Sequence, residues 1–275
     1  ARDRLFQLEI WRRRVTGTMA QIQGPKALER DIGARLLRFR GDLKQEFQHY
    51  HTDGEEIISA FVQGINAYIK LTEKQPDLLP LEFLLLSITP QPWSPAIVLA
   101  RIGGIFLNLE TEVLIANALH TMAPDTIRMM LNLHPGAPAL PVPEGLDLST
   151  IPSDILKYYQ AARSPVAFES EDILDPNNRA SETSDTITQA ATPTLTGIAG
   201  GQDEGSNNWV VSGTKTLSRH PFMVNDPHRS ITAPSLRYWV HLVAPGWNVI
   251  GGGEPHLPGV SIGHNEHGAW GLTIF

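Results

Sequence analysis

The sequence contains no cysteine among its 275 residues. Disulfide bonds, a thiolate nucleophile and thiolate metal sites are therefore excluded, although this absence does not decide the compartment. Long apolar runs are also missing, and none approaches the roughly 20 residues that a membrane-spanning helix needs. Positive charge is in the minority, with 22 Lys and Arg against 29 Asp and Glu. The resulting net charge of −7 argues against a nucleic-acid binder.

Several catalytic signatures are absent as well. The G-x-S-x-G elbow of an ordinary serine hydrolase does not occur. The run Ser212-Gly213-Thr214-Lys215-Thr216 lacks the glycine spacing of a phosphate-binding loop. His256, His264 and His267 lie close together, but their spacing is not that of a zinc site. A metal-dependent hydrolase stays an alternative, which loss of activity on chelation would support.

What is present is the composition of a globular protein, 41% hydrophobic and 19% charged, long enough to bury a sizeable core. Apolar residues recur at three- and four-residue spacing over 3–22 and 55–70. This periodicity predicts two helices, with Asp53 as a candidate N-cap of the second. Arg12 falls on the apolar stripe of the first helix, so its burial would require a carboxylate partner.

The next part of the chain is interrupted by proline. Prolines between 79 and 95 exclude a continuous helix there, and the proline-rich stretch 134–152 predicts an extended arm. Residues 96–120 are apolar on most sides, which favours a buried helix, and a further short helix is expected over 123–132.

The composition then changes. Residues 180–205 are mainly Ser, Thr, Ala, Gly and acidic residues, a mixture that buries little apolar surface. We therefore predict a surface spacer over 166–205, between a helical region at 1–165 and a different region that starts at residue 206.

From residue 206 onward the pattern predicts an antiparallel sheet. Short apolar runs are separated by expected turn clusters at Asn225-Asp226-Pro227 and Gly251-Gly252-Gly253. The predicted strands are 209–211, 222–224, 236–243, 248–250, 260–262 and 269–275. A helical part followed by a sheet part is the pattern of an α+β protein.

The two ends suggest a part of a longer protein. The chain opens at Ala1 directly in a helical pattern, and it stops within the apolar run 272–275. We therefore expect the fold to be truncated at both ends. An earlier segment would have room for a secretion signal, and we expect a periplasmic or secreted protein.

The boundary between Gly205 and Ser206 carries the most chemical information. A serine inside a chain is a weak nucleophile, but a serine at a free N-terminus has its own base, an α-amine with a pKa of about 8. Cleavage before Ser206 would create that catalytic group, and Gly205 would tolerate the strained backbone that such cleavage needs. Because Gly-Ser pairs are common in linkers, an ordinary linker junction stays the alternative at this point.

Motifs elsewhere in the chain add to this boundary. The second half contains GSNNWVV at 205–211, NDPH at 225–228, GHN at 263–265 and AWGLT at 269–273. The first half contains DRLFQLE at 3–9, GINAYI at 64–69 and PQPW at 90–93. In letters, order and spacing these motifs resemble the penicillin acylase family of N-terminal nucleophile hydrolases. The resemblance covers most of the chain and is strongest over 1–17 and 205–275.

This resemblance implies a four-layer αββα core and roles for individual residues. Ser206 matches the nucleophile, the first residue of the family's β-chain. His228 matches a position that contacts the nucleophile in some members, although a turn histidine without a catalytic part is the alternative. Ile274 matches the residue whose backbone N–H is half of the oxyanion hole. The other half, an asparagine, would lie beyond Phe275.

Substrate and metal residues are also implied. Arg229, Ser261 and Ile262 match positions that line the acyl pocket. Phe106 lies near such positions and is equally suited to a core. Arg229 stands where some relatives have an aromatic residue, a departure that favours a polar or longer acyl chain. Glu112 matches a ligand of a structural calcium ion, with an ordinary ion-pair role as the alternative.

The resemblance therefore implies an amidase that cuts itself before Ser206 and whose two chains stay associated. Its substrate would be an N-acylated small molecule, such as a β-lactam or an acyl-homoserine lactone. It would need no cofactor for catalysis and would bind neither nucleic acid nor membrane. The rival hypothesis is a non-catalytic relative that acts as a binding or scaffold protein, which a replaced downstream asparagine would favour.

Overall fold

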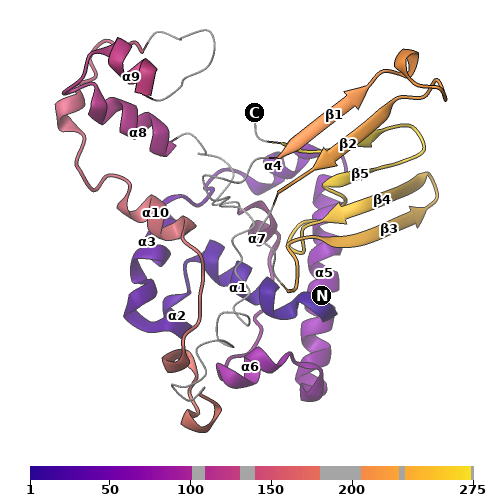
Figure 1. The fold of residues 1–275 in the computed structure, drawn as a ribbon. Helices are drawn as coiled ribbons and strands as arrows, with labels where there is room; N and C mark the ends of the chain where they lie inside the picture. Colours follow the sequence, from indigo (N-terminus) through magenta and orange to yellow (C-terminus); the bar gives the residue numbers. More distant parts are fainter. Residues whose placement is uncertain (101–108, 131–139, 180–205, 229–232, 274–275) are drawn as a thin grey trace.

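A computed structural model describes residues 1–100, 109–130, 140–179, 206–228 and 233–273. Helices occupy the first part of the chain and strands the second (Figure 1). The expected mixture of helix and sheet is therefore observed, whereas the four-layer αββα arrangement stays a prediction. Most of the predicted spacer, residues 180–205, lies outside the described residues.

The described helices match the predictions only in part. In the described part they are α1 Leu5–Thr16, α2 Ala20–Gln23, α3 Leu28–Leu36, α4 Leu43–Tyr50, α5 Gly54–Lys74, α6 Leu81–Leu85, α7 Pro95–Leu99, α8 Leu109–Ala118, α9 Pro124–Met130 and α10 Lys157–Arg163. The predictions at 55–70 and 123–132 are confirmed as α5 and α9. Among the described residues, no helix is both long enough and apolar enough to cross a membrane.

The single helix predicted over 3–22 is wrong, because it is broken at Gly17. This residue has a φ of 65° and a ψ of 53°, the left-handed conformation that ends helices. Its N–H donates to Arg13 and Arg14 carbonyls, so the last turn of α1 is closed before the chain turns into α2. A three- and four-residue period continues across such a break and does not reveal it.

The buried helix predicted over 96–120 is also wrong in its described parts. Ile97 and Val98 of α7 are buried, but α7 ends at Leu99. None of the residues of α8 is buried. Figure 1 shows the reason, since α8 and α9 lie at one extremity of the molecule, away from the main group of helices.

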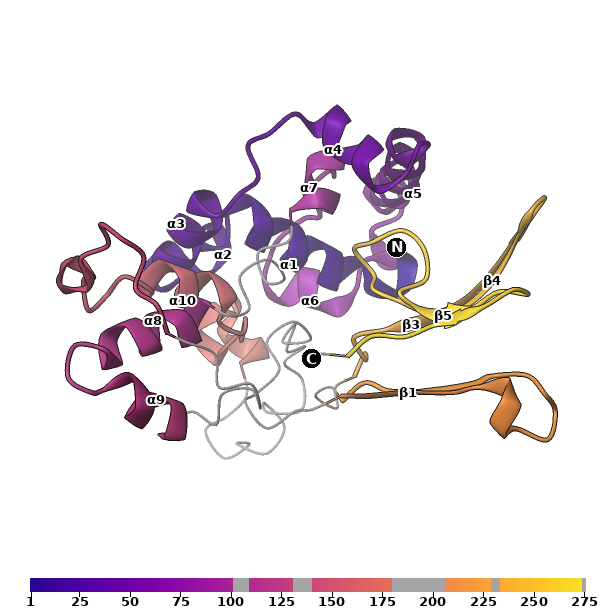
Figure 2. The same ribbon diagram turned by 90° about the horizontal axis from the view of Figure 1, so that it is seen from above.

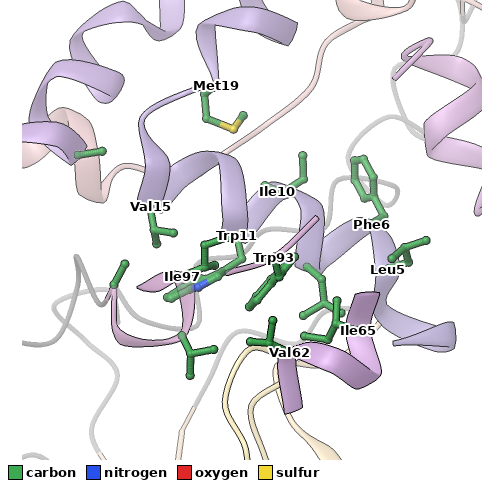
Figure 3. Close-up of a cluster of buried hydrophobic side chains, with 14 of the residues drawn as sticks. Leu5, Phe6, Ile10, Trp11, Val15, Met19, Val62, Ile65, Trp93 and Ile97 are labelled. Carbon is green, nitrogen blue, oxygen red and sulfur yellow. The ribbon is translucent and has the colours of Figure 1, made fainter. Parts of the chain in front are cut away.

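The hydrophobic core lies within the helical part. One face of α5 contributes Val62 and Ile65, which point toward Trp11 of α1 and Trp93 (Figure 3). Met19, after the break in α1, is completely buried. Many apolar side chains of the strands are exposed instead, and Trp239 is 81% exposed. The helices therefore supply most of the buried apolar surface in the described residues.

The chain after α10 is packed against the helices although it includes the start of the predicted spacer. Val166 is only 1% exposed, and the ring of Phe168 lies 5.8 Å from that of Phe6. Arg30 donates to the carbonyls of Ser164 and Pro165 at 2.6 and 2.7 Å. These contacts attach the segment firmly to α1 and α3.

The strands form two antiparallel sheets. The smaller contains β1 Asn207–Val211 and β2 Phe222–Asp226, and the larger contains β3 Tyr238–Ala244, β4 Trp247–Gly253, β5 Ile262–His264 and β6 Ala269–Trp270 in that order. In Figure 2 the β1–β2 ribbon and the larger sheet extend away from the helices as two separate ribbons. Each predicted strand overlaps an observed strand in the same order, although β6 ends at Trp270 and is shorter than the predicted 269–275.

The turn predicted at Gly251-Gly252-Gly253 is wrong, since these glycines end strand β4. They pair with Val240, Trp239 and Tyr238 of β3. A Cβ atom on Gly251 would come within 2.1 Å of the carbonyl oxygen of Ile262 in β5. The glycines therefore permit close approach of neighbouring strands.

Candidate active site

Ser206 lies immediately before β1 and is half-buried. The strand forms here because Trp209, Val210 and Val211 favour extended structure and pair with β2. In this antiparallel register Asn207 lies opposite Asp226. The end of β2 and the residues after it are thereby brought beside Ser206.

His228 reaches Ser206 through its main chain. The N–H of His228 donates to Oγ of Ser206 at 3.2 Å. Proline has no N–H, so this amide is the first main-chain donor after Asp226. The imidazole Nε2 is hydrogen-bonded to Oδ2 of Asp226 at 2.9 Å. Contact between His228 and Ser206 agrees with the sequence analysis, but a catalytic role for the imidazole stays a prediction.

The segment after β6 lies on another side of Ser206. The hydroxyl of Thr273 donates to the carbonyl oxygen of Ser206 at 2.5 Å. Asn225, near the end of β2, forms hydrogen bonds to both Leu272 and Asn207. No role was predicted for Asn225 or Thr273. The only signal was their place in the NDPH and AWGLT motifs, since their partners are distant in sequence.

Four of the predicted site residues cannot be placed. Gly205, Ile274, Phe106 and Arg229 lie outside the described residues. The predicted oxyanion donor at Ile274 comes directly after Thr273 in the sequence.

Ser261 and Ile262 lie on the larger sheet. Ile262 is the first residue of β5 and is paired with Gly252 of β4. The N–H of Ser261 donates to the carbonyl of Gly252 at 2.9 Å, which extends this pairing by one residue. Both side chains are half-buried. Contact of these two side chains with an acyl group stays a prediction.

Glu112 does not complete a metal site with the described residues. It lies in the first turn of α8 and is exposed to solvent. No group of three or more His, Asp or Glu side chains in the described chain could hold a metal ion. Calcium prefers six to eight oxygen ligands, so Glu112 would need ligands from elsewhere.

The geometry at Ser206 suits a serine that acts as a nucleophile. A hydroxyl oxygen that accepts a main-chain hydrogen bond keeps its own proton available for a base. The same N–H would stabilise negative charge developing on that oxygen. The fold and site thus define a candidate serine nucleophile at the start of a sheet strand.

The sequence model of the penicillin amidase family matches residues 1–275, and the chain belongs to this family.

Individual relatives agree with this assignment. The chain is 28% identical to a penicillin acylase 2 proenzyme of Pseudomonas sp. over 277 residues, covering 99% of this chain and 32% of the relative. It is 25% identical to an acyl-homoserine lactone acylase of Pseudomonas aeruginosa over 283 residues, 100% of this chain and 29% of the relative. It is 27% identical to a penicillin G acylase of Escherichia coli over 305 residues, 99% of this chain and 35% of the relative. The chain thus spans about a third of the length of these relatives.

Proposed function

We propose that the protein to which this chain belongs is a self-processing amidase with Ser206 as its nucleophile. The observation that carries the proposal is the hydrogen bond from the His228 N–H to Oγ of Ser206, at the start of β1. Membership of the penicillin amidase family supports amide hydrolysis as the reaction class.

Self-cleavage would use the same hydroxyl. Oγ of Ser206 would attack the carbonyl carbon of Gly205, and the peptide nitrogen of Ser206 would leave with a proton. Water would then hydrolyse the resulting ester, which releases Gly205 as a new carboxyl terminus. Ser206 would be left with a free amine and a free hydroxyl, the pair that catalysis requires.

Amide hydrolysis would follow the same logic. The Ser206 amine takes the hydroxyl proton while Oγ attacks the substrate carbonyl. The Ile274 N–H and a side-chain donor from elsewhere in the protein would stabilise the tetrahedral oxyanion. The proton passes to the leaving amine, and water releases the acid from the acyl-serine. His228 would tune Oγ through its main-chain contact.

The substrate class we propose is an N-acylated small molecule of the β-lactam or acyl-homoserine lactone type. The names of the relatives support both types. Phe106, Arg229, Ser261 and Ile262 would line the acyl pocket. Glu112 would contribute to a structural calcium site, and a periplasmic or secreted location completes the proposal.

The deciding experiment is the intact mass and N-terminal sequence of the purified full-length gene product. We expect two pieces, one beginning at Ser206, and a single uncut chain for Ser206→Ala. Ser212→Ala is the matched control, because Ser212 lies in the exposed loop after β1 and bonds only locally. A folded wild-type chain that stays uncut would overturn the proposal.

Activity is tested separately on the same preparations. Release of free amine would be measured from phenylacetylated β-lactams and from acyl-homoserine lactones of several chain lengths. We expect hydrolysis by the wild type and by Ser212→Ala, and none by Ser206→Ala. A cleaved wild type that is inactive on both classes would contradict the proposed substrate class alone.

A further inference from the structure

Asn225 joins three segments of the chain through one side chain. Its Nδ2 donates to the carbonyl oxygens of Asn207 at 3.1 Å and of Leu272 at 2.9 Å. Its Oδ1 accepts from the N–H of Leu272 at 3.3 Å. Asn225 therefore satisfies both main-chain groups of Leu272, as a neighbouring strand would, and ties this residue to the start of β1.

Ser206 itself is held from two directions. The Thr273 hydroxyl donates to its carbonyl oxygen, while the His228 N–H donates to its side-chain oxygen. Thr273 follows Leu272 directly, so the position of Thr273 depends on the contacts that Asn225 makes. The main chain and the hydroxyl of Ser206 thus have separate supports.

Gly271 makes this arrangement possible. A Cβ atom at this position would lie 2.5 Å from Cε of Met223 and 2.6 Å from Cγ of Asn225. Only a residue without a side chain lets the main chain approach Asn225 so closely. We call Asn225, Gly271 and Thr273 the terminal clamp.

We propose that Asn225 and Thr273 are positioning residues that hold Ser206 in place once the bond before it has been cut. This inference rests on the proposed function. Before cleavage, Ser206 is tethered by peptide bonds on both sides. After cleavage it is a chain end, and chain ends lose order unless contacts hold them.

The chemistry of the clamp explains why these residue types are present. Asparagine offers two donors and an acceptor on one flat group, which matches two carbonyls and one N–H. Aspartate would place a carboxylate against the same two carbonyls. The clamp also holds Leu272 and Thr273, the two residues that precede the predicted oxyanion donor Ile274 in the sequence.

The test uses the full-length gene product with Thr273→Val and Asn225→Asp, which keep side-chain shape but remove the donors. The fraction cut before Ser206 is followed over time by mass, and kcat and KM are measured on the cut enzyme with the best substrate of the wild type. We expect cleavage to proceed and kcat to fall by about 10- to 100-fold, since small misplacement of reacting groups costs this much. KM should change much less.

Two further variants separate positioning from general damage. Thr273→Ser keeps the hydroxyl and should restore most of the lost kcat. Thr216→Val is the matched control, because the Thr216 hydroxyl donates to the main chain of Gly213 and His220 in the β1–β2 connection. This control should leave kcat unchanged, whereas an equal fall in kcat would overturn the clamp.

The outcomes distinguish the clamp from the proposed function. A cut, active wild type with unchanged kcat in both Thr273→Val and Asn225→Asp would overturn the clamp and leave the amidase standing. An uncut, inactive wild type would overturn the proposed function itself. If Asn225→Asp does not fold, Thr273→Val decides, since it removes one hydroxyl from an exposed residue.

Discussion

At the scale of single residues, the charges of α1 show how a buried carboxylate organises its neighbours. Glu9 is only 1% exposed and accepts two hydrogen bonds from Arg12, at 3.0 and 2.8 Å. It also forms an ion pair with Arg13 at 2.7 Å and accepts the N–H of Gln91. The requirement that a buried Arg12 has a carboxylate partner is confirmed. Arg14 lies on the same helix. Its burial, and to a smaller extent the positive charge of Arg30, lower its pKa to about 10.

Replacement of Glu9 by glutamine should therefore destabilise the protein strongly. The change leaves two largely buried guanidinium groups without their counter-charge, and we expect a loss of about 3–5 kcal/mol. Urea unfolding measures it. Glu55→Gln is the matched control, since the Glu55 side chain is 47% exposed and its Oε2 lies 3.9 Å from Nζ of Lys44, and its effect should stay below about 1 kcal/mol. Equal effects of the two variants would contradict this account of Glu9.

At the scale of elements, local periodicity predicted that helices are present but not where they end or how far they are buried. The stripe of α5 was found because its buried residues, Ile58, Val62, Ile65 and Ile69, recur at helical spacing. The break after α1 was not predicted, because it depends on the backbone conformation of a single glycine. The exposure of α8 depends on where the helix lies, which its own apolar residues do not reveal.

Two glycine-to-alanine variants compare a glycine that ends a helix with a glycine inside a helix. At Gly17 the left-handed φ is combined with a Cβ position 2.7 Å from the carbonyl oxygen of Asp31. We expect Gly17→Ala to cost at least about 1–2 kcal/mol of unfolding free energy. Gly64 lies inside α5 with open space around it, so Gly64→Ala should stabilise by about 0.5–1 kcal/mol.

Thermal or urea unfolding of both variants gives the comparison. Opposite signs are expected for the two substitutions, because the same added methyl group meets strain at one site and solvent at the other. Destabilisation by Gly64→Ala would show that a tertiary contact at α5 has been missed.

At the scale of the whole molecule, the helical and sheet parts meet at specific contacts. The indole of Trp11 stacks on the imidazole of His256, with ring centres 3.6 Å apart. Arg4 donates to the carbonyl of Ser235 at 2.6 Å, and Glu254 lies 3.4 Å from His256. The contacts of Trp11 and Arg4 join α1 and the residue before it to the chain around the larger sheet, on the two sides of the proposed cleavage site.

If the chain is cut before Ser206, these contacts should keep the two pieces together. We expect Trp11→Leu to lower the urea concentration at which the pieces separate, because it removes the stacked ring. Trp11→Phe keeps an aromatic face and should lie close to the wild type. Size-exclusion chromatography at increasing urea concentration measures the separation, and identical profiles for both variants would exclude a role for the stack.

The sequence by itself determined the absence of thiol chemistry, the division into a helical and a sheet part, and the approximate places of α5, α9 and the strands. These features follow from composition and from periods of two to four residues, which neighbours in the chain encode locally. The candidate nucleophile came from the resemblance of several motifs to a known family, because the Gly205-Ser206 pair alone left a linker junction open. Only the tertiary structure decided the surroundings of Ser206. Thr273 and Ser206 are 67 residues apart, and Asn225 and Leu272 are 47 apart. Such pairs meet only through strand register and the placement of two sheets, which no local pattern specifies.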